Sequence, residues 1–260
     1  MLEKIEIKKI IDIAKQAGDV IMKVYAKDFE VEFKADESPL TEADKQAHNV
    51  IVAGLEGLEL NIPVLSEEGK GIAYADRKDW EYFWLVDPVD GTKEFVKKNG
   101  EFTVNIALIH KDTPVLGVVY APALNEMYWA KKDEGAFKQE SSGDILKLPK
   151  ANRRKEDELV AVASKSHMSE ETKTFIDSYA EDYSEVSIQS IGSSLKLCLV
   201  AEGEADIYPR LGPTMEWDTG AAHAIVLEAG LTLQQYSFEN GYEPHLYNKE
   251  NLLNSWFVVK

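Results

Sequence analysis

The sequence predicts an α+β fold in which a strand-rich first half joins a second half of alternating strands and helices. Two observations support this prediction. Across residues 80–140, short apolar runs and period-two alternation follow one another between turn signals, which is typical of an antiparallel sheet. Beyond about residue 158, apolar runs of strand length alternate with stretches of helical period, which is typical of an α/β layer. We expect residues 1–150 and 151–260 to form the two halves of one compact unit.

The first half is expected to begin with two amphipathic helices and to continue as a sheet. Apolar residues recur at helical spacing from about Leu2 to Tyr25 and from Thr41 to Leu58. Between them, residues 29–33 predict a strand, and a short buried strand at residues 63–65 ends at the acidic segment Ser66–Gly69. Residues 70–80 are polar and contain glycine, which predicts a loop. The expected strands of the sheet are residues 82–86, 103–109, 115–120, 127–130 and 135–137.

The second half is expected to follow a polar junction at residues 140–158. Helical spacing predicts helices at residues 169–179, 194–201 and 216–229. Apolar runs predict strands at residues 159–163, 186–191, 206–208, 231–235 and 256–259.

The composition limits the function classes. The 260-residue chain has a formal net charge of −17, from 29 basic and 46 acidic residues. A nucleic acid polymer needs a basic surface, so this class of partner is not expected, whereas local cations or metal ions can still hold a small anion. The single cysteine, Cys198, excludes an intrachain disulfide and a thiolate metal site. No apolar run approaches the roughly 20 residues of a membrane-spanning helix, and the first residues lack a signal-peptide core, so we expect a cytoplasmic protein.

The segment Asp87–Thr92 is the strongest candidate for chemistry. Asp87 follows an apolar strand, so we expect its side chain to emerge where the sheet meets solvent. Asp90-Gly91 is a turn signal, because glycine readily adopts positive φ, and a short helix can begin at Thr92. Two carboxylates would then face one small volume beside the N–H groups of Gly91 and Thr92, which suits a Mg²⁺ ion that bridges the protein and a phosphate. Taken alone, a plain surface turn explains the segment equally well.

Three further acidic positions fit the same chemistry, and each has an ordinary alternative. Glu67 and Glu68 end a predicted strand; because neighbouring side chains diverge, only one is expected to bind a metal directly, and a solvated acidic loop is the alternative. Asp218 lies near the start of a predicted helix, where the helix dipole favours a carboxylate with or without a metal. Asp44 lies three residues after Thr41, a spacing that is typical of helix capping. The alternative is that Asp44 lies behind a nucleophilic water.

Together, these segments resemble the inositol monophosphatase superfamily of Mg²⁺-dependent, Li⁺-sensitive phosphatases. The family signatures appear as Asp87-Pro88-Val89-Asp90-Gly91-Thr92 and Trp217-Asp218-Thr219-Gly220-Ala221. Within the superfamily, the chain looks most similar to bacterial 3'(2'),5'-bisphosphate nucleotidases, over segments that include Val64–Glu68, Gly91–Phe95, Asn99–Leu108 and Ile191–Lys196. The resemblance covers essentially the whole chain and implies a layered α-β-α-β-α sandwich.

The resemblance also implies roles for individual residues. The implied metal ligands are Glu67, Asp87, Asp90, Asp218 and the backbone carbonyl of Val89. Asp44 and Thr92 are implied to orient and deprotonate the attacking water, and Glu67 is the third expected catalytic residue. The expected substrate-contacting residues are Glu67, Val89, Asp90, Gly91, Thr92, Asp218, Ser194, Lys196, Arg210, Lys165 and His167. Within this set, the N–H groups of Gly91 and Thr92 are implied to hold phosphate. Lys196, Arg210, Lys165 and His167 are candidates for holding the nucleotide, and ordinary surface lysines are the alternative for Lys196 and Lys165.

The implied reaction removes the 3'-phosphate of adenosine 3',5'-bisphosphate, giving AMP and phosphate. Two or three Mg²⁺ ions are expected in the site, with inhibition by Li⁺, and the sulfated analogue of the substrate is also compatible. One alternative is an inositol or sugar monophosphatase; another is a non-catalytic binding or regulatory protein that keeps the fold. The sequence is compatible with a monomer or a homodimer, and with peripheral association with a membrane surface.

Overall fold

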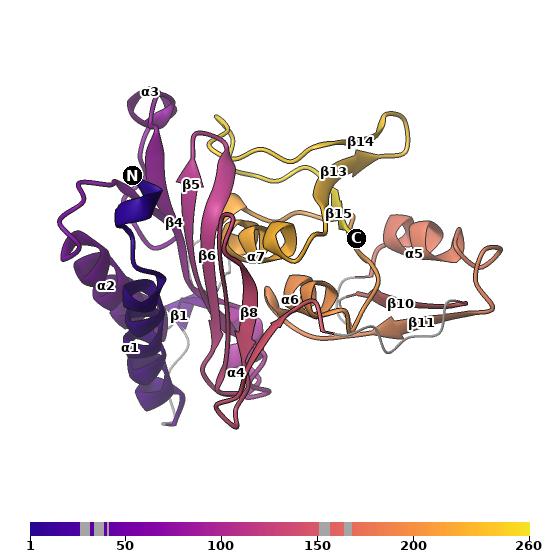
Figure 1. Cartoon of the computed structure of the whole chain (residues 1–260), viewed down its shortest axis with the longest axis horizontal. Coiled ribbons are helices and arrows are strands. Elements are labelled where there is room, and N and C mark those ends of the chain that lie inside the picture. The colour runs from indigo at the N-terminus through magenta and orange to yellow at the C-terminus, as the bar shows by residue number, and fades with distance from the viewer. Residues whose placement is uncertain (27–31, 34–38, 41, 151–156, 164–167) are drawn as a thin grey trace.

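The chain folds into alternating layers of helices and sheets. The computed structural model describes residues 1–260 except 27–31, 34–38, 41, 151–156 and 164–167. Across the molecule, the layers are α1 (Ile7–Tyr25) with α2 (Glu42–Glu56), a large sheet, α6 (Leu195–Glu202) with α7 (Glu216–Glu228), a second sheet, and α5 (Glu170–Asp177) (Figure 1). This order confirms the α-β-α-β-α fold class. Within the described residues, no helix has both the length and the apolar character needed to cross a membrane.

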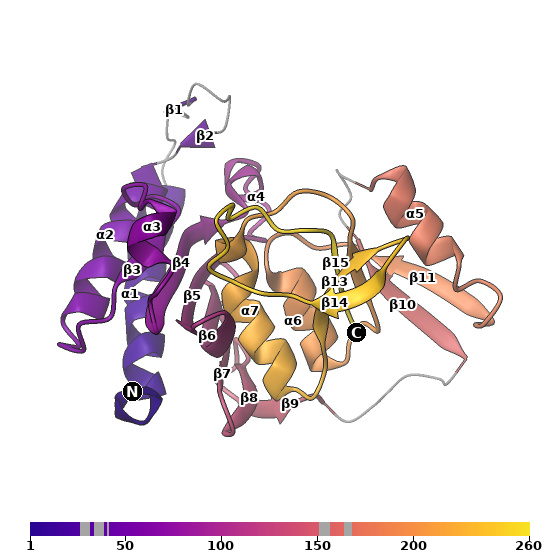
Figure 2. The same cartoon turned by 90° about the horizontal axis from the view of Figure 1, so that it is seen from above.

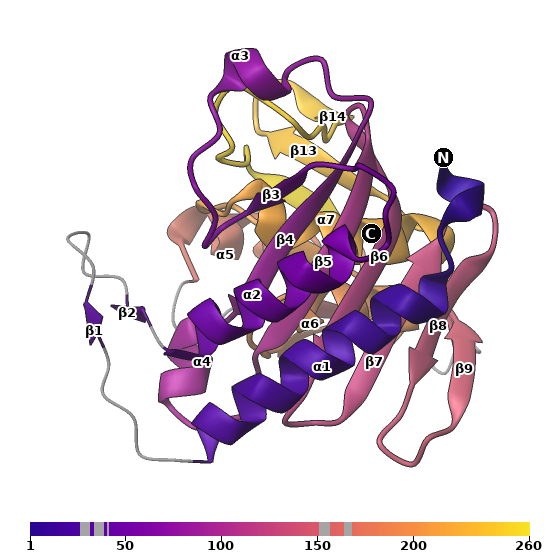
Figure 3. The same ribbon diagram turned by 90° about the vertical axis from the view of Figure 1, so that its left-hand side faces the viewer.

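Helices α1 and α2 lie side by side across one face of the large sheet (Figure 3). Buried residues of both helices, such as Ile13 and Ile51, belong to the same apolar core as Ile106 of the sheet. The predicted first helix is interrupted near its start, because a 3₁₀ turn at Leu2–Lys4 is followed by extended backbone before α1 begins. Position 41, the expected start of the second helix, and positions 29–31 of the predicted strand lie outside the described residues.

The large sheet contains the antiparallel meander that the sequence predicts. Its strands, in spatial order, are β3 (Val64–Ser66), β4 (Tyr82–Asp90), β5 (Thr103–His110), β6 (Thr113–Ala121), β7 (Glu126–Lys131), β8 (Gly135–Gln139) and β9 (Ile145–Leu148). All neighbouring pairs are antiparallel except β3 and β4, which run parallel with Ser66 opposite Val86. The parallel pairing brings the residues after β3 and those at the end of β4 to the same edge of the sheet.

Two segments of this half differ from the prediction. The expected loop at residues 70–80 contains one turn of helix, α3 (Tyr74–Arg77), and the buried guanidinium of Arg77 donates a 2.7 Å hydrogen bond to Asn248 Oδ1. The expected polar junction at residues 140–158 contains β9, an edge strand whose Ile145 is 60% exposed. Neither element could be predicted from its polar composition. Helix α3 is held by a residue distant in the sequence, and β9 buries little apolar surface. The division of the chain at residue 150 stays a prediction.

Helix α7 packs very closely on the large sheet, next to α6 (Figure 2). Gly117 on β6 lies directly beneath this helix, and a methyl group at that position would overlap the backbone carbonyl of Ala221. On the helix side, a methyl group at Gly220 would come within 2.9 Å of Leu85 Cδ2 on β4. Two glycines therefore permit the close approach that brings the first turn of α7 near the end of β4.

The second sheet forms from the other half of the chain. Strands β10 (Glu158–Val162) and β11 (Glu185–Gln189) pair in parallel, and an isolated bridge between Ala161 and Ile207 links them to the neighbouring strands. These are β12 (Tyr208–Arg210), β15 (Phe257–Val259), β13 (Leu233–Ser237) and β14 (Gly241–Pro244), in that spatial order. Strand β14 was not predicted. The remaining short elements are β1 (Glu32–Phe33), β2 (Pro39–Leu40) and α4 (Thr92–Val96).

A buried ion-pair cluster holds the end of α6 against the large sheet. We call it the Glu202 cluster; it consists of Glu202, Lys138, Lys150 and Tyr128. The carboxylate of Glu202 is 1% exposed and lies 3.1 Å from Lys138 Nζ and 2.7 Å from Lys150 Nζ. The hydroxyl of Tyr128 donates a further hydrogen bond of 2.6 Å to it. Each charge in this cluster therefore has a partner that the chain itself supplies.

Candidate functional site

Asp87 and Asp90 both belong to β4, which continues further than the sequence predicts. The strand extends to Asp90, with a shift in its register against β5 between these two residues. The turn comes at Gly91, which has a φ of 90° and precedes α4. Asp87 was expected at the edge between sheet and solvent but is 1% exposed, and its Oδ1 accepts a 3.0 Å hydrogen bond from the N–H of Val89. The bulge therefore turns both carboxylates toward the same end of the sheet while one stays buried.

Asp218 joins these two residues from the first turn of α7. Its Oδ2 accepts a 2.8 Å hydrogen bond from the backbone N–H of Met215, so it caps the helix as an ordinary helix-start aspartate would. At the same time, Asp87, Asp90 and Asp218 each present a carboxylate oxygen within 4.8 Å of those of the other two. Asp218 therefore caps the helix, and its place beside Asp87 and Asp90 is compatible with the metal-ligand role, which stays a prediction.

Glu67 and Asp44 complete the acidic group, which we call the carboxylate cluster (Asp44, Glu67, Asp87, Asp90, Asp218). Glu67 follows β3, and its N–H bonds to the carbonyl of Val86 at 3.1 Å. Although Glu67 is exposed as a residue, loss of water around its carboxylate raises its pKa to about 7, and the charges of Asp44, Glu68 and Asp90 add to the rise. Asp44 is buried on α2. The two residues thus interact across the gap between a helix and a sheet edge.

The pKa values of the other acids show how unfavourable this concentration of charge is. Burial raises the pKa of Asp87 well above its ordinary value, and the charges of Glu67, Asp90 and Asp218 raise it further. Burial and the charge of Asp90 likewise raise the pKa of Asp218. Among the described residues, no lysine or arginine forms an ion pair with Glu67, Asp87, Asp90 or Asp218. The cluster is therefore a strong candidate for binding a cation.

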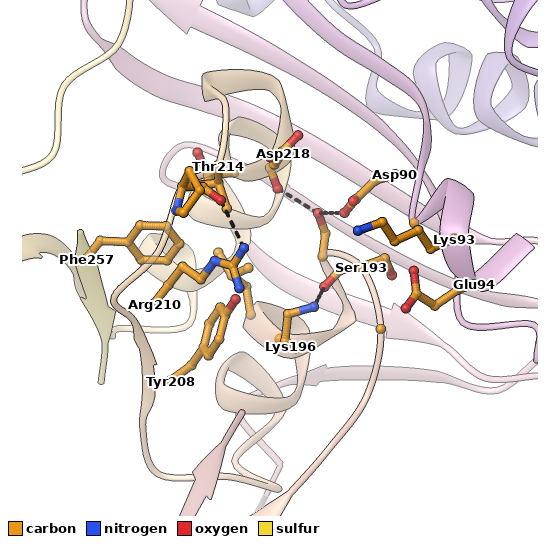
Figure 4. A pocket seen from close by; sticks show the side chains of 16 residues that line it. Asp90, Lys93, Glu94, Ser193, Lys196, Tyr208, Arg210, Thr214, Asp218 and Phe257 are labelled. Atoms are coloured by element: carbon orange, nitrogen blue, oxygen red, sulfur yellow. Dashed lines mark hydrogen bonds between the residues drawn. The ribbon is translucent and has the colours of Figure 1, made fainter. Parts of the chain in front are cut away.

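A cavity of about 170 Å³ opens beside the cluster (Figure 4). Asp90 and Asp218 line one side of it, and Lys196 and Arg210 project into it from the other. Lys196 Nζ donates a 2.6 Å hydrogen bond to the carbonyl of Ser193, and burial lowers the pKa of this lysine. Arg210 Nη2 donates to the carbonyl of Pro213 at 2.9 Å, while its buried Nε has no hydrogen-bond partner in the described part of the chain. Lys93 also lines the cavity, so three cationic residues border the space next to the acids.

The remaining expected site residues have different outcomes. Thr92 begins α4, and its hydroxyl donates to the carbonyl of Val89 at 3.3 Å. Ser194 lines the cavity, but it is buried and its hydroxyl lies 2.7 Å from Asp90 Oδ2. Lys165 and His167 lie outside the described residues.

Asn105 is a site residue that sequence reasoning missed. It lies on β5 opposite Asp87, and its amide nitrogen donates to Ser194 Oγ at 2.9 Å. The available signal was a polar side chain in the middle of the apolar run at residues 103–109. In a strand buried on both faces, such a residue requires specific partners.

The residues present fit a divalent cation. Hard divalent ions prefer oxygen ligands, which the carboxylate cluster offers. In addition, two buried polar atoms at strand positions opposite Asp87 and Asp90, Asn105 Oδ1 and Thr103 Oγ1, have no hydrogen-bond partner among the described residues. Because buried polar atoms are nearly always paired, these orphans point to donors that a hydrated ion would bring.

The chain is similar to known proteins over nearly its full length. The model of the inositol monophosphatase family matches residues 4–255. The chain is 46% identical to the 3'(2'),5'-bisphosphate nucleotidase CysQ of Salmonella typhimurium over 97% of this chain and 98% of that protein. It is 45% identical to CysQ of Escherichia coli strain K12 over 96% and 98% of the two chains.

Solved structures show the same relationship. CysQ from Bacteroides thetaiotaomicron superposes with a TM-score of 0.87 at 47% identity and covers 98% of this chain and 96% of its own. The IMPase of Thermotoga maritima superposes with a TM-score of 0.72 at 26% identity, over 96% and 89% of the two chains. A family match over nearly the full length, relatives at this identity and a common fold lead to one conclusion: the chain belongs to the inositol monophosphatase family.

Proposed function

We propose that this protein is a metal-dependent 3'(2'),5'-bisphosphate nucleotidase that converts adenosine 3',5'-bisphosphate to AMP and phosphate. One observation carries the proposal: the carboxylate cluster shares a wall, formed by Asp90 and Asp218, with a cavity lined by Lys93, Lys196 and Arg210. A bisphosphate has one phosphate to lose and a second by which it can be held. The near full-length similarity to CysQ nucleotidases supports the same assignment.

The metal site of this proposal is the carboxylate cluster. Glu67, Asp87, Asp90 and Asp218 would hold two or three Mg²⁺ ions, with the backbone carbonyl of Val89 as a further ligand. When bound, such ions lower the pKa of water and neutralise the oxygens of the reacting phosphate. The acidic side chains would then gain the counter-charges that they lack among the described residues.

The residues around the cluster would prepare the water and the phosphate. Because the Thr92 hydroxyl directs its proton to the Val89 carbonyl, its lone pairs are free to accept a hydrogen bond from the attacking water. The buried carboxylate of Asp44, whose charge acts on both Glu67 and Asp87, would take the proton of that water. The N–H groups of Gly91 and Thr92 would hold the phosphate oxygens. Water attacks phosphorus directly, so no serine or cysteine nucleophile is needed.

The second phosphate would be bound by Lys196 and Arg210. Both project into the cavity from the side opposite the acids, and both are held there by hydrogen bonds to backbone carbonyls. In a protein with a net charge of −17, a pair of cations at this position is a local exception. The 5'-phosphate is the part of the substrate that would contact them.

A phosphate-release assay tests the proposal. The EDTA-treated protein is given Mg²⁺ and one of three substrates: adenosine 3',5'-bisphosphate, its sulfated analogue or inositol 1-phosphate. We expect the bisphosphate to give the highest kcat/KM, with activity lost in EDTA and reduced by Li⁺. Faster hydrolysis of inositol 1-phosphate would replace the proposal with an inositol monophosphatase, and absence of hydrolysis with every substrate would leave a non-catalytic binding protein.

A further inference from the structure

The hydroxyl of Ser194 lies where four elements of the fold meet. It is 2.7 Å from Asp90 Oδ2 on β4 and 2.7 Å from the backbone carbonyl of Asp218 on α7. On its other side, the amide nitrogen of Asn105 on β5 lies 2.9 Å away. Ser194 itself precedes α6, and both Ser194 and Asn105 are 1% exposed. A single buried hydroxyl thus connects the two elements that carry metal-site carboxylates.

The direction of each hydrogen bond follows from the atoms involved. The amide nitrogen of Asn105 can only donate, so Ser194 Oγ accepts from it. The carboxylate of Asp90 and the carbonyl of Asp218 can only accept, so the one proton of Ser194 goes to either of them. The other amide hydrogen of Asn105 is directed toward Asp90 Oδ2, at 3.5 Å. A flipped amide would place its oxygen against the carboxylate instead, which fixes the orientation of Asn105.

Ordinary helix capping does not account for this serine. Ser194 occupies the N-cap position of α6, where a serine side chain usually accepts a hydrogen bond from the first turn of the helix. No such bond is present, and the hydroxyl is directed at Asp90 and Asp218 instead. The side chain of Ser194 therefore does not cap the helix, and its hydroxyl bridges the two sides of the carboxylate cluster instead.

We propose that Ser194 and Asn105 are positioning residues that fix the Asp90 carboxylate and its spacing from the start of α7, and that their side chains do not contact the substrate. Asn105 acts through Ser194: it occupies the lone pair of the hydroxyl and so directs its proton toward the acceptors. The orphaned Asn105 Oδ1 remains available to a donor brought by a hydrated cation. This inference rests on the proposed metal-dependent function and adds two residues that set its geometry.

Calorimetric titration of the EDTA-treated protein with Mg²⁺, without substrate, tests this inference. Ser194→Ala should weaken Mg²⁺ binding by about 10- to 100-fold, the usual cost of removing a group that orients a metal ligand. Asn105→Ala should weaken Mg²⁺ binding less than Ser194→Ala does, and its effect should be smaller in the Ser194→Ala background than in the wild type, because part of that effect passes through the hydroxyl. A matched control is Thr172→Ala, which removes a buried, hydrogen-bonded hydroxyl from the remote helix α5 and should leave Mg²⁺ affinity unchanged.

Steady-state kinetics separates positioning from substrate contact. For Ser194→Ala we expect kcat/KM to recover toward the wild-type value as Mg²⁺ is raised, with KM for adenosine 3',5'-bisphosphate changed less than threefold at saturating Mg²⁺. Unchanged Mg²⁺ affinity with a raised KM would overturn the inference and make Ser194 a substrate contact. Additive losses in the double variant would overturn the role of Asn105. If Ser194→Ala weakens Mg²⁺ binding but no nucleotide is hydrolysed, the proposed function fails and the positioning role stands.

Discussion

Two carboxylates of the protein are buried to the same degree but have neighbours of opposite charge. Asp87 and Glu202 are each 1% exposed. Glu202 lies between Lys138 and Lys150 and also accepts a hydrogen bond from Tyr128, so its charge is neutralised within the fold. Asp87 instead lies among other acids, and burial together with the charges of Glu67, Asp90 and Asp218 raises its pKa.

Glu202 is a buried acid whose partners the fold supplies, whereas Asp87 is a buried acid that is a candidate for binding a cation. A buried charge costs several kcal/mol unless partners offset the loss of water. The Glu202 cluster supplies those partners from β7, β8 and the segment after β9. The carboxylate cluster has no ion-paired partner for Asp87 among the described residues, which makes the cluster a candidate for binding an external cation. The protein therefore keeps an unfavourable concentration of charge where binding can relieve it.

The largest expected effect comes from removing the charge of Asp87. Asp87→Asn keeps the shape of the side chain and its hydrogen bond from Val89, but it should lower kcat/KM by about 10³-fold, since several kcal/mol of charge stabilisation are lost. In EDTA, the same variant should unfold at a higher urea concentration than the wild type, because a repelling buried charge is gone. A lower midpoint in EDTA would mean that Asp87 has a stabilising partner and would remove the contrast with Glu202.

Glu202→Gln should have the opposite consequence. The change leaves Lys138 and Lys150 without a full counter-charge in a buried place, so the free energy of unfolding should fall by about 3 kcal/mol. Mg²⁺ affinity should stay at the wild-type value, because α6 meets the carboxylate cluster at its other end. Glu204→Gln is the matched control: it removes an exposed partner of the same Lys150, at 3.5 Å, and should cost less than about 0.5 kcal/mol in urea unfolding. Equal losses in both variants would contradict the burial argument.

Added Mg²⁺ should stabilise only the protein whose acids are intact. At a free concentration 100 times the dissociation constant, binding to the folded state alone adds about 2.7 kcal/mol to the free energy of unfolding. We expect this gain for the wild type and for Glu202→Gln, and its near-complete loss for Asp87→Asn. Urea unfolding with and without Mg²⁺ measures it directly. An equal gain in all three proteins would place the Mg²⁺ site elsewhere.

The pH dependence of the metal-free protein gives the smallest but most specific test. The pKa of Asp87 is raised by burial from its ordinary value of 3.8, and that of Glu67 is raised from 4.5 to about 7. A raised carboxyl pKa favours the folded state while the group is protonated, so stability in EDTA should fall as pH rises from about 4 through about 7. Glu67→Gln should make this slope shallower. A stability that rises over this range would mean that the acids are favourably ionised without metal.

Much of the fold was predictable because its elements follow simple periods. The helices α1, α2 and α7 and the strands of the meander carry apolar residues at the spacing that their burial requires. What the sequence could not show was long-range pairing. Arg77 gives its loop a fixed place through Asn248, 171 residues away, and the bulge that buries Asp87 arises only from the register between β4 and β5.

In the candidate site, too, features that are local in the sequence could be predicted and features that depend on long-range packing could not. The acids could be identified from strand ends, a helix start and the family signatures, since these features are local. Asn105 stands out in the sequence only as a polar residue in an apolar run. Its bond to Ser194, and the bond of Ser194 to the carbonyl of Asp218, depend on which strand and which helix lie side by side, so local sequence does not show them. Similarly, the sequence placed Lys196 and Arg210 on separate elements, and only the packing of α6 next to β12 brings them into one cavity.

The geometry of the carboxylate cluster depends on Gly117 as well as on the acids themselves. Because the backbone of Ala221 rests where a side chain would be, a single added methyl group on β6 would push α7 outward. Asp218 would move with the helix, while Asp87 and Asp90 would stay with the sheet. The distance of Asp218 from Asp87 and Asp90 therefore depends on how closely α7 packs on the large sheet, and Gly117 sets this packing distance. A design that grafts these acidic motifs onto another layered fold must therefore also keep a glycine on the strand beneath the helix.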